Sequence, residues 1–275
     1  PASISRNIAA DVPIVADARD AIHILLQKAK PLEIGEWREE IRRWKAEYPI
    51  DMGHFGLTPQ RVIQAINDLF SEAVIVTDVG QNQLWTTQFL ALNERKQMLT
   101  SGGLGTMGYG LPAGIGAKIG NPRKPVVVVT GDGGMQMNIQ ELATAVVYEL
   151  PIIICILNNG YLGNVRQWQE LFYGRRYSST CMRYRKSCPS ACERPGENCP
   201  DYTPDFVRLA QSYGAKGIRV TESDAVEDAL RNAKQNEKGP VVIEFIIDRE
   251  ANVMPIVPPG KPLYEMITGK ENLWR

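Results

Sequence analysis

Apolar positions along the chain switch repeatedly between a strand-like and a helix-like period. Continuous runs rich in Val and Ile predict buried strands at residues 73–77, 125–130, 151–157, 217–220 and 240–247. Amphipathic segments between them predict helices at residues 58–69, 81–92, 111–119, 136–149, 161–172, 204–213 and 223–235. This alternation is typical of an α/β fold with a parallel sheet, helices on both faces and right-handed crossovers. Ligands in such folds bind at the carboxyl ends of the strands.

The first 50 residues follow a different pattern. Residues 12–16 predict a short strand with Pro13 near its start, and residues 18–28 predict a helix. Residues 31–49 are charged and contain Trp37 and Trp44, which favours an exposed linker with one helical stretch. We therefore divide the chain into the end of a preceding domain (1–30), a linker (31–50), the main domain (51–260) and a C-terminal tail (261–275). Because the chain begins with Pro1, we expect a piece of a longer protein.

Composition and charge exclude several classes of protein. Hydrophobic residues make up 44% and charged residues 23%, as in ordinary globular proteins. Lys and Arg together number 31 and are balanced by 31 Asp and Glu, so no overall positive field favours nucleic acid or an anionic membrane as a partner. Neither a bilayer-spanning apolar run nor a signal-peptide pattern is visible, so we expect a cytoplasmic location.

Polar motifs directly follow two of the predicted strands. Gly131-Asp132-Gly133-Gly134 follows the strand at 125–130, Asn158-Asn159 follows the strand at 151–157, and 24 residues separate Gly133 from Asn158. One crossover helix fits this spacing, so Asp132 and Asn159 should meet at the same edge of adjacent parallel strands. One carboxylate and one carboxamide oxygen suit Mg²⁺ with phosphate and water completing its octahedron. The glycines permit close backbone approach, and a helix expected from Gln136 directs its amides there, so we predict a metal-bridged diphosphate.

This spacing resembles the signature of thiamine-diphosphate enzymes. Longer segments of residues 51–260 resemble the C-terminal, diphosphate-binding domain of the acetolactate synthase (acetohydroxyacid synthase) catalytic subunits. The matching segments are TDVGQNQLW (77–85), TSGGLGTMG (100–108), GNVRQWQ (163–169), LFY (171–173) and VMPIVPPG (253–260).

The resemblance implies a role for individual residues. Asp132, Asn159 and the backbone carbonyl of Tyr161 would hold Mg²⁺, and Gln81 and Asn82 would lie against the diphosphate. Relatives often carry histidine at Asn82, and an amide keeps a donor there but loses the titratable group. Met107 would support a bent cofactor, a role that suits a bulky thioether able to wedge between two rings. The implied cofactor-binding residues are Gly80, Gln81, Asn82, Gly105, Met107, Gly131, Gly133, Gly134 and Met137.

The helix expected at 161–172 carries the implied substrate-pocket residues Val165 and Trp168. In the resembling family, the matching tryptophan favours 2-ketobutyrate over pyruvate as the second substrate. Contact with one extra methyl group contributes only about 1–3 kcal/mol, so such a residue biases the choice. A core tryptophan is the alternative interpretation.

The resemblance also implies a reaction and partners. Pyruvate would be decarboxylated and its two-carbon unit joined to a second 2-keto acid in branched-chain amino acid biosynthesis. FAD contacts, a homodimer or tetramer and a regulatory small subunit belong to the full-length family members. The glutamate that activates thiamine comes from an N-terminal domain of the partner subunit, so we expect the isolated chain to be inactive. Residues 1–30 resemble only the end of the middle, flavin-associated domain.

Two alternatives use the same segments. Residues 103–108 also match the dinucleotide fingerprint G-x-G-x-x-G, with Asp132 about 24 residues further on. The polar segment 96–101 is a poor central strand for such a unit, and the fingerprint does not predict Asn158-Asn159. A different thiamine-diphosphate carboligase or decarboxylase would share the metal motif, and Trp168 and residues 253–260 argue against it.

Cysteines distinguish this chain from its relatives. Cys155 lies in an apolar strand, but four others form a C-x6-C-x3-C-x6-C pattern in an insert at 181–200 that relatives do not usually carry. Four thiolates are able to hold Zn²⁺ or an iron–sulfur cluster, to form two disulfides, or to remain as thiols in a surface loop. A non-catalytic, metal-responsive module is therefore the third interpretation. The residues concerned are Cys181, Cys188, Cys192 and Cys199.

Overall fold

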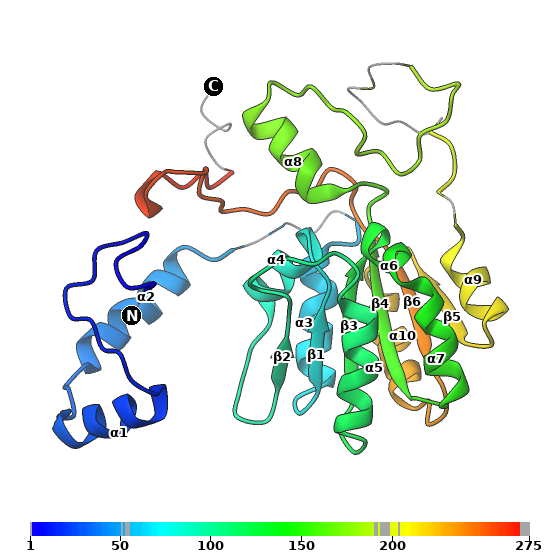
Figure 1. The fold of residues 1–275 in the computed structure, drawn as a ribbon. Coiled ribbons are helices and arrows are strands. Elements are labelled where there is room, and N and C mark those ends of the chain that lie inside the picture. Colours follow the sequence, from blue (N-terminus) through cyan, green and yellow to red (C-terminus); the bar gives the residue numbers. More distant parts are fainter. Residues whose placement is uncertain are drawn as a thin grey trace. The chain divides into compact units, whose positions relative to one another are not determined.

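The computed structural model describes residues 2–50, 52, 56–189, 192, 199–202 and 204–269. The chain divides into two compact units, Pro1–Pro49 and Ile50–Arg275 (Figure 1). Among the described residues, no helix is long and apolar enough to cross a membrane.

The first unit contains two helices, α1 (Ala18–Lys28) and α2 (Gly35–Glu47), and neither buries a residue. The Asp17 carboxylate caps α1 by accepting a hydrogen bond from the Arg19 amide at 2.9 Å. The strand predicted at 12–16 is wrong, because residues 2–50 contain no strand. An isolated strand leaves its backbone groups unpaired, and Pro13 has no N–H to offer a neighbour.

The second unit is built on a six-stranded parallel sheet, which confirms the predicted α/β fold. Its strand order is β2-β1-β3-β4-β6-β5 (Figure 1). The segment at 96–101 supplies β2, a short edge strand next to β1 in which two of three residues are exposed. The strands are β1 (Val74–Thr77), β2 (Gln97–Leu99), β3 (Val126–Gly131), β4 (Ile152–Asn158), β5 (Lys216–Val220) and β6 (Val241–Ile246).

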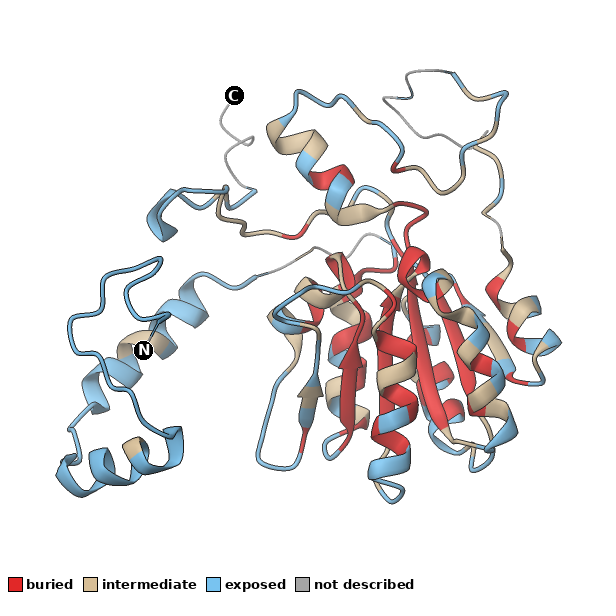
Figure 2. Ribbon diagram, in the orientation of Figure 1, coloured by how far each residue is buried: buried red, intermediate tan, exposed pale blue. Residues whose placement is uncertain are grey.

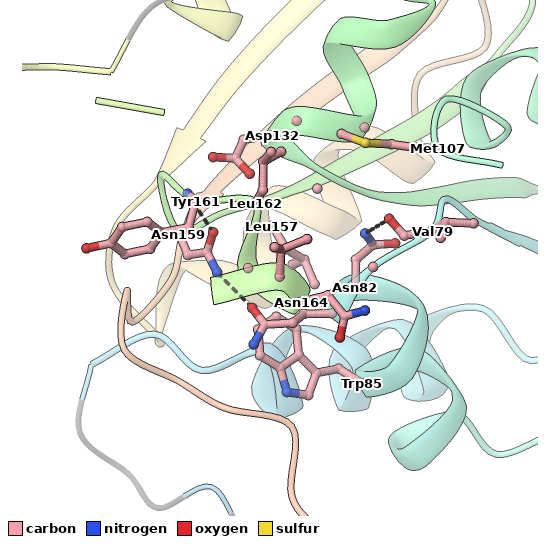
Figure 3. A pocket seen from close by; sticks show the side chains of 17 residues that line it. Val79, Asn82, Trp85, Met107, Asp132, Leu157, Asn159, Tyr161, Leu162 and Asn164 are labelled. Atoms are coloured by element: carbon pink, nitrogen blue, oxygen red, sulfur yellow. Dashed lines mark hydrogen bonds between the residues drawn. The ribbon is translucent and has the colours of Figure 1, made fainter. Parts of the chain in front are cut away.

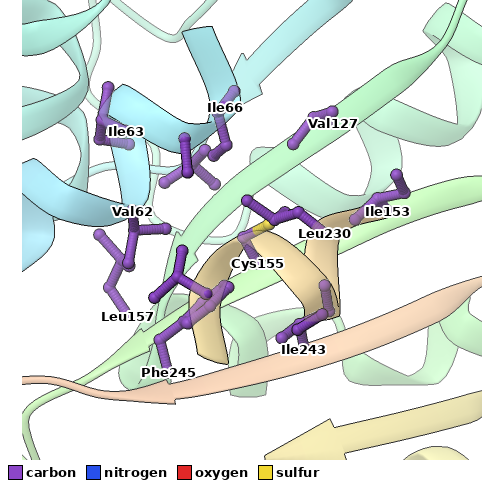
Figure 4. Packing of buried hydrophobic residues seen from close by; sticks show 14 of the residues in the cluster. Val62, Ile63, Ile66, Val127, Ile153, Cys155, Leu157, Leu230, Ile243 and Phe245 are labelled. Atoms are coloured by element: carbon purple, nitrogen blue, oxygen red, sulfur yellow. The ribbon is translucent and has the colours of Figure 1, made fainter. Parts of the chain in front are cut away.

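Helices cover both faces of this sheet and create two apolar cores. Alternate residues of a strand point to opposite faces, so Val127 and Val126 of β3 belong to different clusters. The four inner strands β1, β3, β4 and β6 are buried along most of their length (Figure 2). Figure 4 shows the first cluster, which includes Ile66, Cys155 and Leu230. The first face is covered by α3 (Pro59–Leu69), α4 (Gln81–Phe89) and α10 (Ala225–Lys234), and the second by α5 (Gly110–Gly120), α7 (Leu142–Val147) and α9 (Phe206–Ser212).

The helix predicted at 136–149 is three separate elements. The first, α6 (Asp132–Met137), begins four residues earlier than predicted, and η1 (Ile139–Glu141) and α7 follow. Asn138 interrupts the helix with a φ of −133°, and its side-chain amide donates to the Gly108 carbonyl at 2.8 Å. This bond ties the turn after α6 to the glycine-rich segment 102–108. The remaining elements are α8 (Gly163–Phe172) and η2 (Leu263–Glu265).

Two glycines of α5 provide a matched test of how closely this helix packs on β3. A Cβ at buried Gly114 would overlap the Cγ2 of Val128, whereas a Cβ at exposed Gly116 would meet nothing within 4 Å. We expect Gly114→Ala to lower the free energy of unfolding by about 1–3 kcal/mol, because the helix must shift. Gly116→Ala should raise it by up to about 1 kcal/mol through helix propensity. Urea unfolding of both variants checks this, and equal effects would contradict the close packing.

Candidate functional site

The carboxyl ends of β3 and β4 bring the two polar motifs together. Gly131 pairs with Leu157 in the parallel ladder, so the residues that follow each strand lie side by side. Asp132 opens α6, is 1% exposed, and accepts a hydrogen bond from the Gly160 amide on its Oδ2 at 2.9 Å. Asp132 and Asn159 thus occupy one sheet edge, where the strand spacing predicts them.

Hydrogen bonds fix the orientation of the Asn159 side chain. Its Nδ2 donates to Gln81 Oε1 at 3.0 Å, and its Oδ1 accepts from the Tyr161 amide at 3.1 Å. The guanidinium groups of Arg166 and Arg249 lie 4.7 and 4.5 Å from the centre of the Tyr161 ring, and Arg249 Nε donates to the Asn159 carbonyl at 3.1 Å. These contacts hold the turn that contains the expected metal ligands.

A pocket opens at this edge (Figure 3). Most of the sequence-predicted residues line it, including all three expected metal ligands and Val165. Gly105, Met137 and Trp168 are not part of its lining, and the side chains of Met137 and Trp168 are about half exposed. The pocket is lined by Val79, Gly80, Gln81, Asn82, Trp85, Met107, Gly131, Asp132, Gly133, Gly134, Leu157, Asn159, Tyr161, Leu162, Gly163, Asn164 and Val165.

Glycines keep the pocket open. A Cβ at Gly133 would lie 2.8 Å from Leu162 Cδ2 and 2.9 Å from Met107 Cε. A Cβ at Gly163 would overlap Gln81 Oε1, which holds Asn159. A larger residue at either position would therefore displace side chains that form the walls of the pocket.

The electrostatics favour a cation beside Asp132. Burial raises the pKa of the Asp132 carboxyl to about 7, although the amides of Gly133 and Gly160 and the Tyr202 hydroxyl act to lower it. A buried carboxylate is stabilised when a positive charge compensates it. The oxygen donors here, a carboxylate, an amide and a backbone carbonyl, are those that Mg²⁺ accepts.

Two buried amide oxygens in the pocket lack a partner among the described residues, Asn82 Oδ1 and Asn164 Oδ1. Unpaired buried oxygens cost free energy, so a bound group should supply hydrogen-bond donors or water to them. Asn164 is absent from the sequence prediction, since its residue type and place near the start of a helix carry no distinctive signal.

Asp78 is the most important residue that the motif analysis left without a role. It is 1% exposed and accepts hydrogen bonds from the amides of Gly108 (3.0 and 3.1 Å), Gly110 (2.8 Å) and Val79 (2.8 Å). It thereby holds the glycine-rich segment that presents Met107. The sequence signal that could have found it is a carboxylate directly after the strand predicted at 73–77.

Gln81 lines the pocket, but its amide is engaged with protein groups. Its Nε2 donates to Gln167 Oε1 at 2.9 Å and to the Ala251 carbonyl at 3.2 Å. Gln167 in turn exchanges two hydrogen bonds with the backbone of Val253, at 2.8 and 2.9 Å. Gln81 therefore couples Asn159 to α8 and to the segment after β6.

Three cysteines of the insert lie beside this site, in a pocket that shares Tyr161 with it. Cys181, Cys192 and Cys199 line a second pocket that also contacts Tyr161, whereas Cys188 Sγ accepts from the Arg185 amide at 3.4 Å. Among the described residues, no three Cys, His, Asp or Glu side chains gather closely enough to hold a metal ion. Residues 190, 191 and 193–198 of the insert lie outside the described part of the chain.

Comparisons with known proteins agree with this geometry. The family model "Thiamine pyrophosphate enzyme, C-terminal TPP binding domain" matches residues 78–245. The acetolactate synthase large subunit of Cyanidium caldarium is 40% identical over 276 residues, covering 97% of this chain and 44% of the relative. The large subunit of Corynebacterium glutamicum is 41% identical, and the match covers 94% of this chain and 41% of the relative. The large subunit of isozyme 3 from Escherichia coli is 37% identical, and the match covers 98% of this chain and 46% of the relative. The chain thus spans less than half the length of these curated relatives.

Proposed function

The chain belongs to the thiamine pyrophosphate enzymes, whose C-terminal cofactor-binding domain it carries, and from this premise we propose that it forms the diphosphate half of an acetolactate synthase active site. The observation that carries the proposal is the meeting of Asp132, Asn159 and Tyr161 in one pocket at the ends of β3 and β4. Acetolactate synthase large subunits match nearly the whole chain.

The donor set fits Mg²⁺ bound to a diphosphate. Asp132 would supply a carboxylate oxygen, Asn159 its Oδ1 and Tyr161 its backbone carbonyl, leaving the other positions to diphosphate oxygens and water. The Asn159 nitrogen is already committed to Gln81, and its oxygen, which accepts one hydrogen bond from the Tyr161 amide, keeps a second lone pair for the metal. Gly131, Gly133 and Gly134 would let the backbone approach the diphosphate closely.

When bound, thiamine diphosphate supplies the electron sink for decarboxylation of a 2-keto acid. The residues of the pocket would orient it and shield it from water. Met107 and Leu162 flank Gly133 and form an apolar wall of the pocket. Asn82 and Asn164 would offer their oxygens, which lack a partner among the described residues, to hydrogen-bond donors of the bound group or to water.

Substrate selection would depend on α8. Val165 lines the pocket and Trp168 lies one turn further along the same helix. We propose pyruvate as the first substrate and pyruvate or 2-ketobutyrate as the second. FAD binding, a homodimer or tetramer, a regulatory small subunit and a cytoplasmic location stay predictions from the resemblance.

The 275-residue chain on its own should bind the cofactor without turning over substrate. Asp132 is the only carboxylate among the described residues that line the pocket, and in the proposed site it would be committed to the metal. No second carboxylate is therefore available there to act as a base toward the cofactor.

An assay with pyruvate, Mg²⁺ and thiamine diphosphate tests this proposal. We expect the purified chain to bind the cofactor, measured by calorimetry, and to form no acetolactate above the protein-free control. Acetolactate formation that Asp132→Ala abolishes would overturn the predicted inactivity and leave the cofactor site intact. Failure to bind the cofactor would contradict the site itself.

A further inference from the structure

A further buried carboxylate, besides Asp132 and Asp78, lies close to the turn that contains the expected metal ligands. Glu244 on β6 is 2% exposed and lies in an otherwise apolar strand. Both of its oxygens are engaged: Oε1 accepts from Asn158 Nδ2 at 2.7 Å, and Oε2 accepts from Arg219 Nε at 2.7 Å. Arg219 lies directly opposite it on β5 and is 43% exposed, so one partner is deeply buried and the other reaches solvent.

Asn158 connects this carboxylate to the expected metal ligands. It is the last residue of β4 and is 4% exposed. Its Oδ1 accepts from the Gly160 amide at 3.0 Å, and the same N–H donates to Asp132 Oδ2 at 2.9 Å. Gly160 has a φ of +73° and lies between Asn159 and Tyr161, so its peptide orientation sets where both of those ligands point.

A carboxylate only accepts hydrogen bonds, whereas an amide side chain has one donating and one accepting end. Glu244 therefore attracts the nitrogen of Asn158 and turns its oxygen toward Gly160. With the opposite orientation, two donors would face each other at Gly160. Neither Glu244 nor Asn158 lines the pocket, so both would act on the bound group through other residues and not by direct contact.

We infer that Glu244 is a positioning residue for the cation site, acting through the Asn158 amide on the Gly160 turn. The inference rests on the proposed function, since it concerns the same Mg²⁺ site. Outer-shell partners of metal ligands typically contribute 10- to 100-fold in metal affinity.

Binding of Mn²⁺ at saturating thiamine diphosphate measures this effect, because electron paramagnetic resonance quantifies the free ion. Glu244→Met removes the acceptor at similar volume, and Asn158→Ala removes the connecting amide. Each should weaken Mn²⁺ binding by about 10- to 100-fold. If Glu244→Met does not fold, Asn158→Ala gives the answer independently.

Two further variants separate positioning from a structural or purely electrostatic role. Glu244→Gln keeps an oxygen for buried Asn158, while exposed Arg219 is able to move away, so Mn²⁺ affinity should stay within about threefold of the parent chain. Arg219→Gln leaves the Asn158 contact intact and should behave likewise, even though both variants lose the ion pair and some stability.

The inference is overturned if folded Asn158→Ala or Glu244→Met binds Mn²⁺ like the parent chain. It is also overturned if Glu244→Gln weakens binding as much as Glu244→Met, because the charge would then matter and not the amide orientation. If the parent chain itself fails to bind Mn²⁺ with thiamine diphosphate, the proposed function fails, and the inference with it.

Discussion

Replacing Asp78 with alanine should destabilise the second unit more than any other substitution considered, by about 3 kcal/mol or more. The carboxylate accepts hydrogen bonds from the buried amides of Gly108 and Gly110 and from the partly buried amide of Val79. Each amide left unpaired costs about 1–3 kcal/mol, and a whole domain is stable by only about 5–15 kcal/mol. Denaturant unfolding measures the loss. Thiamine diphosphate binding should disappear with it, because the segment that carries Met107 loses its anchor.

Two variants serve as controls for Asp78. Asp78→Asn keeps one accepting oxygen and should lose less stability than Asp78→Ala. Exposed Asp248 also follows a strand, but it caps only the Glu250 amide at 3.0 Å, so Asp248→Ala should cost no more than about 1 kcal/mol. If Asp78→Ala cost no more than Asp248→Ala, Asp78 would not organise the glycine-rich segment.

The second large effect is expected from the Asp132 carboxylate. Its charge should lower the free energy of unfolding of the ligand-free chain and raise that of the chain with Mg²⁺ and thiamine diphosphate bound. Because burial raises the pKa of this carboxyl from 3.8 to about 7, the folded state holds the proton more tightly than the unfolded state does. The ligand-free chain should therefore lose stability as the pH rises from about 4 to about 7, by a few kcal/mol in total. Above pH 7 this loss is complete.

Asp132→Asn should remove that pH dependence. At pH 8 without ligands the variant should be more stable than the parent chain, because it no longer buries an uncompensated charge. With Mg²⁺ and thiamine diphosphate the order should reverse, because the variant has lost its anionic ligand. Unfolding curves from pH 5 to 8, with and without ligands, check both signs. This account would be contradicted if ligand-free Asp132→Asn were less stable than the parent chain at pH 8 and if Mg²⁺ with thiamine diphosphate still stabilised the variant.

Strand composition was sufficient to predict most of the fold. The Val- and Ile-rich runs that became β3 and β4 are buried on both faces, which makes their sequence signal strong. The exceptions depend on context. Residues 12–16 have apolar side chains but form no strand, and β2 is only three residues long and mostly exposed because it lies at the sheet edge. The break at Asn138 depends on a bond to Gly108, thirty residues earlier, which no local pattern encodes.

The site was predictable where it depends on strand ends and not where it depends on long-range contacts. Asp132 and Asn159 follow adjacent strands, so their meeting follows from topology. Glu244 is 86 residues from Asn158 in sequence, and only the strand order brings β6 beside β4. The exposure of Trp168 likewise depends on how α8 packs, which periodicity alone does not determine.

The most direct test of the central claim is thermal unfolding of the chain with Mg²⁺ alone, thiamine diphosphate alone, both together, and NAD. The account predicts stabilisation only by the pair, about 2.7 kcal/mol at a hundredfold excess over Kd and hence a shift of several degrees, and no such shift in Asp132→Ala. Stabilisation by NAD, or an equal shift by the pair in Asp132→Ala, would contradict a Mg²⁺-diphosphate site at the ends of β3 and β4.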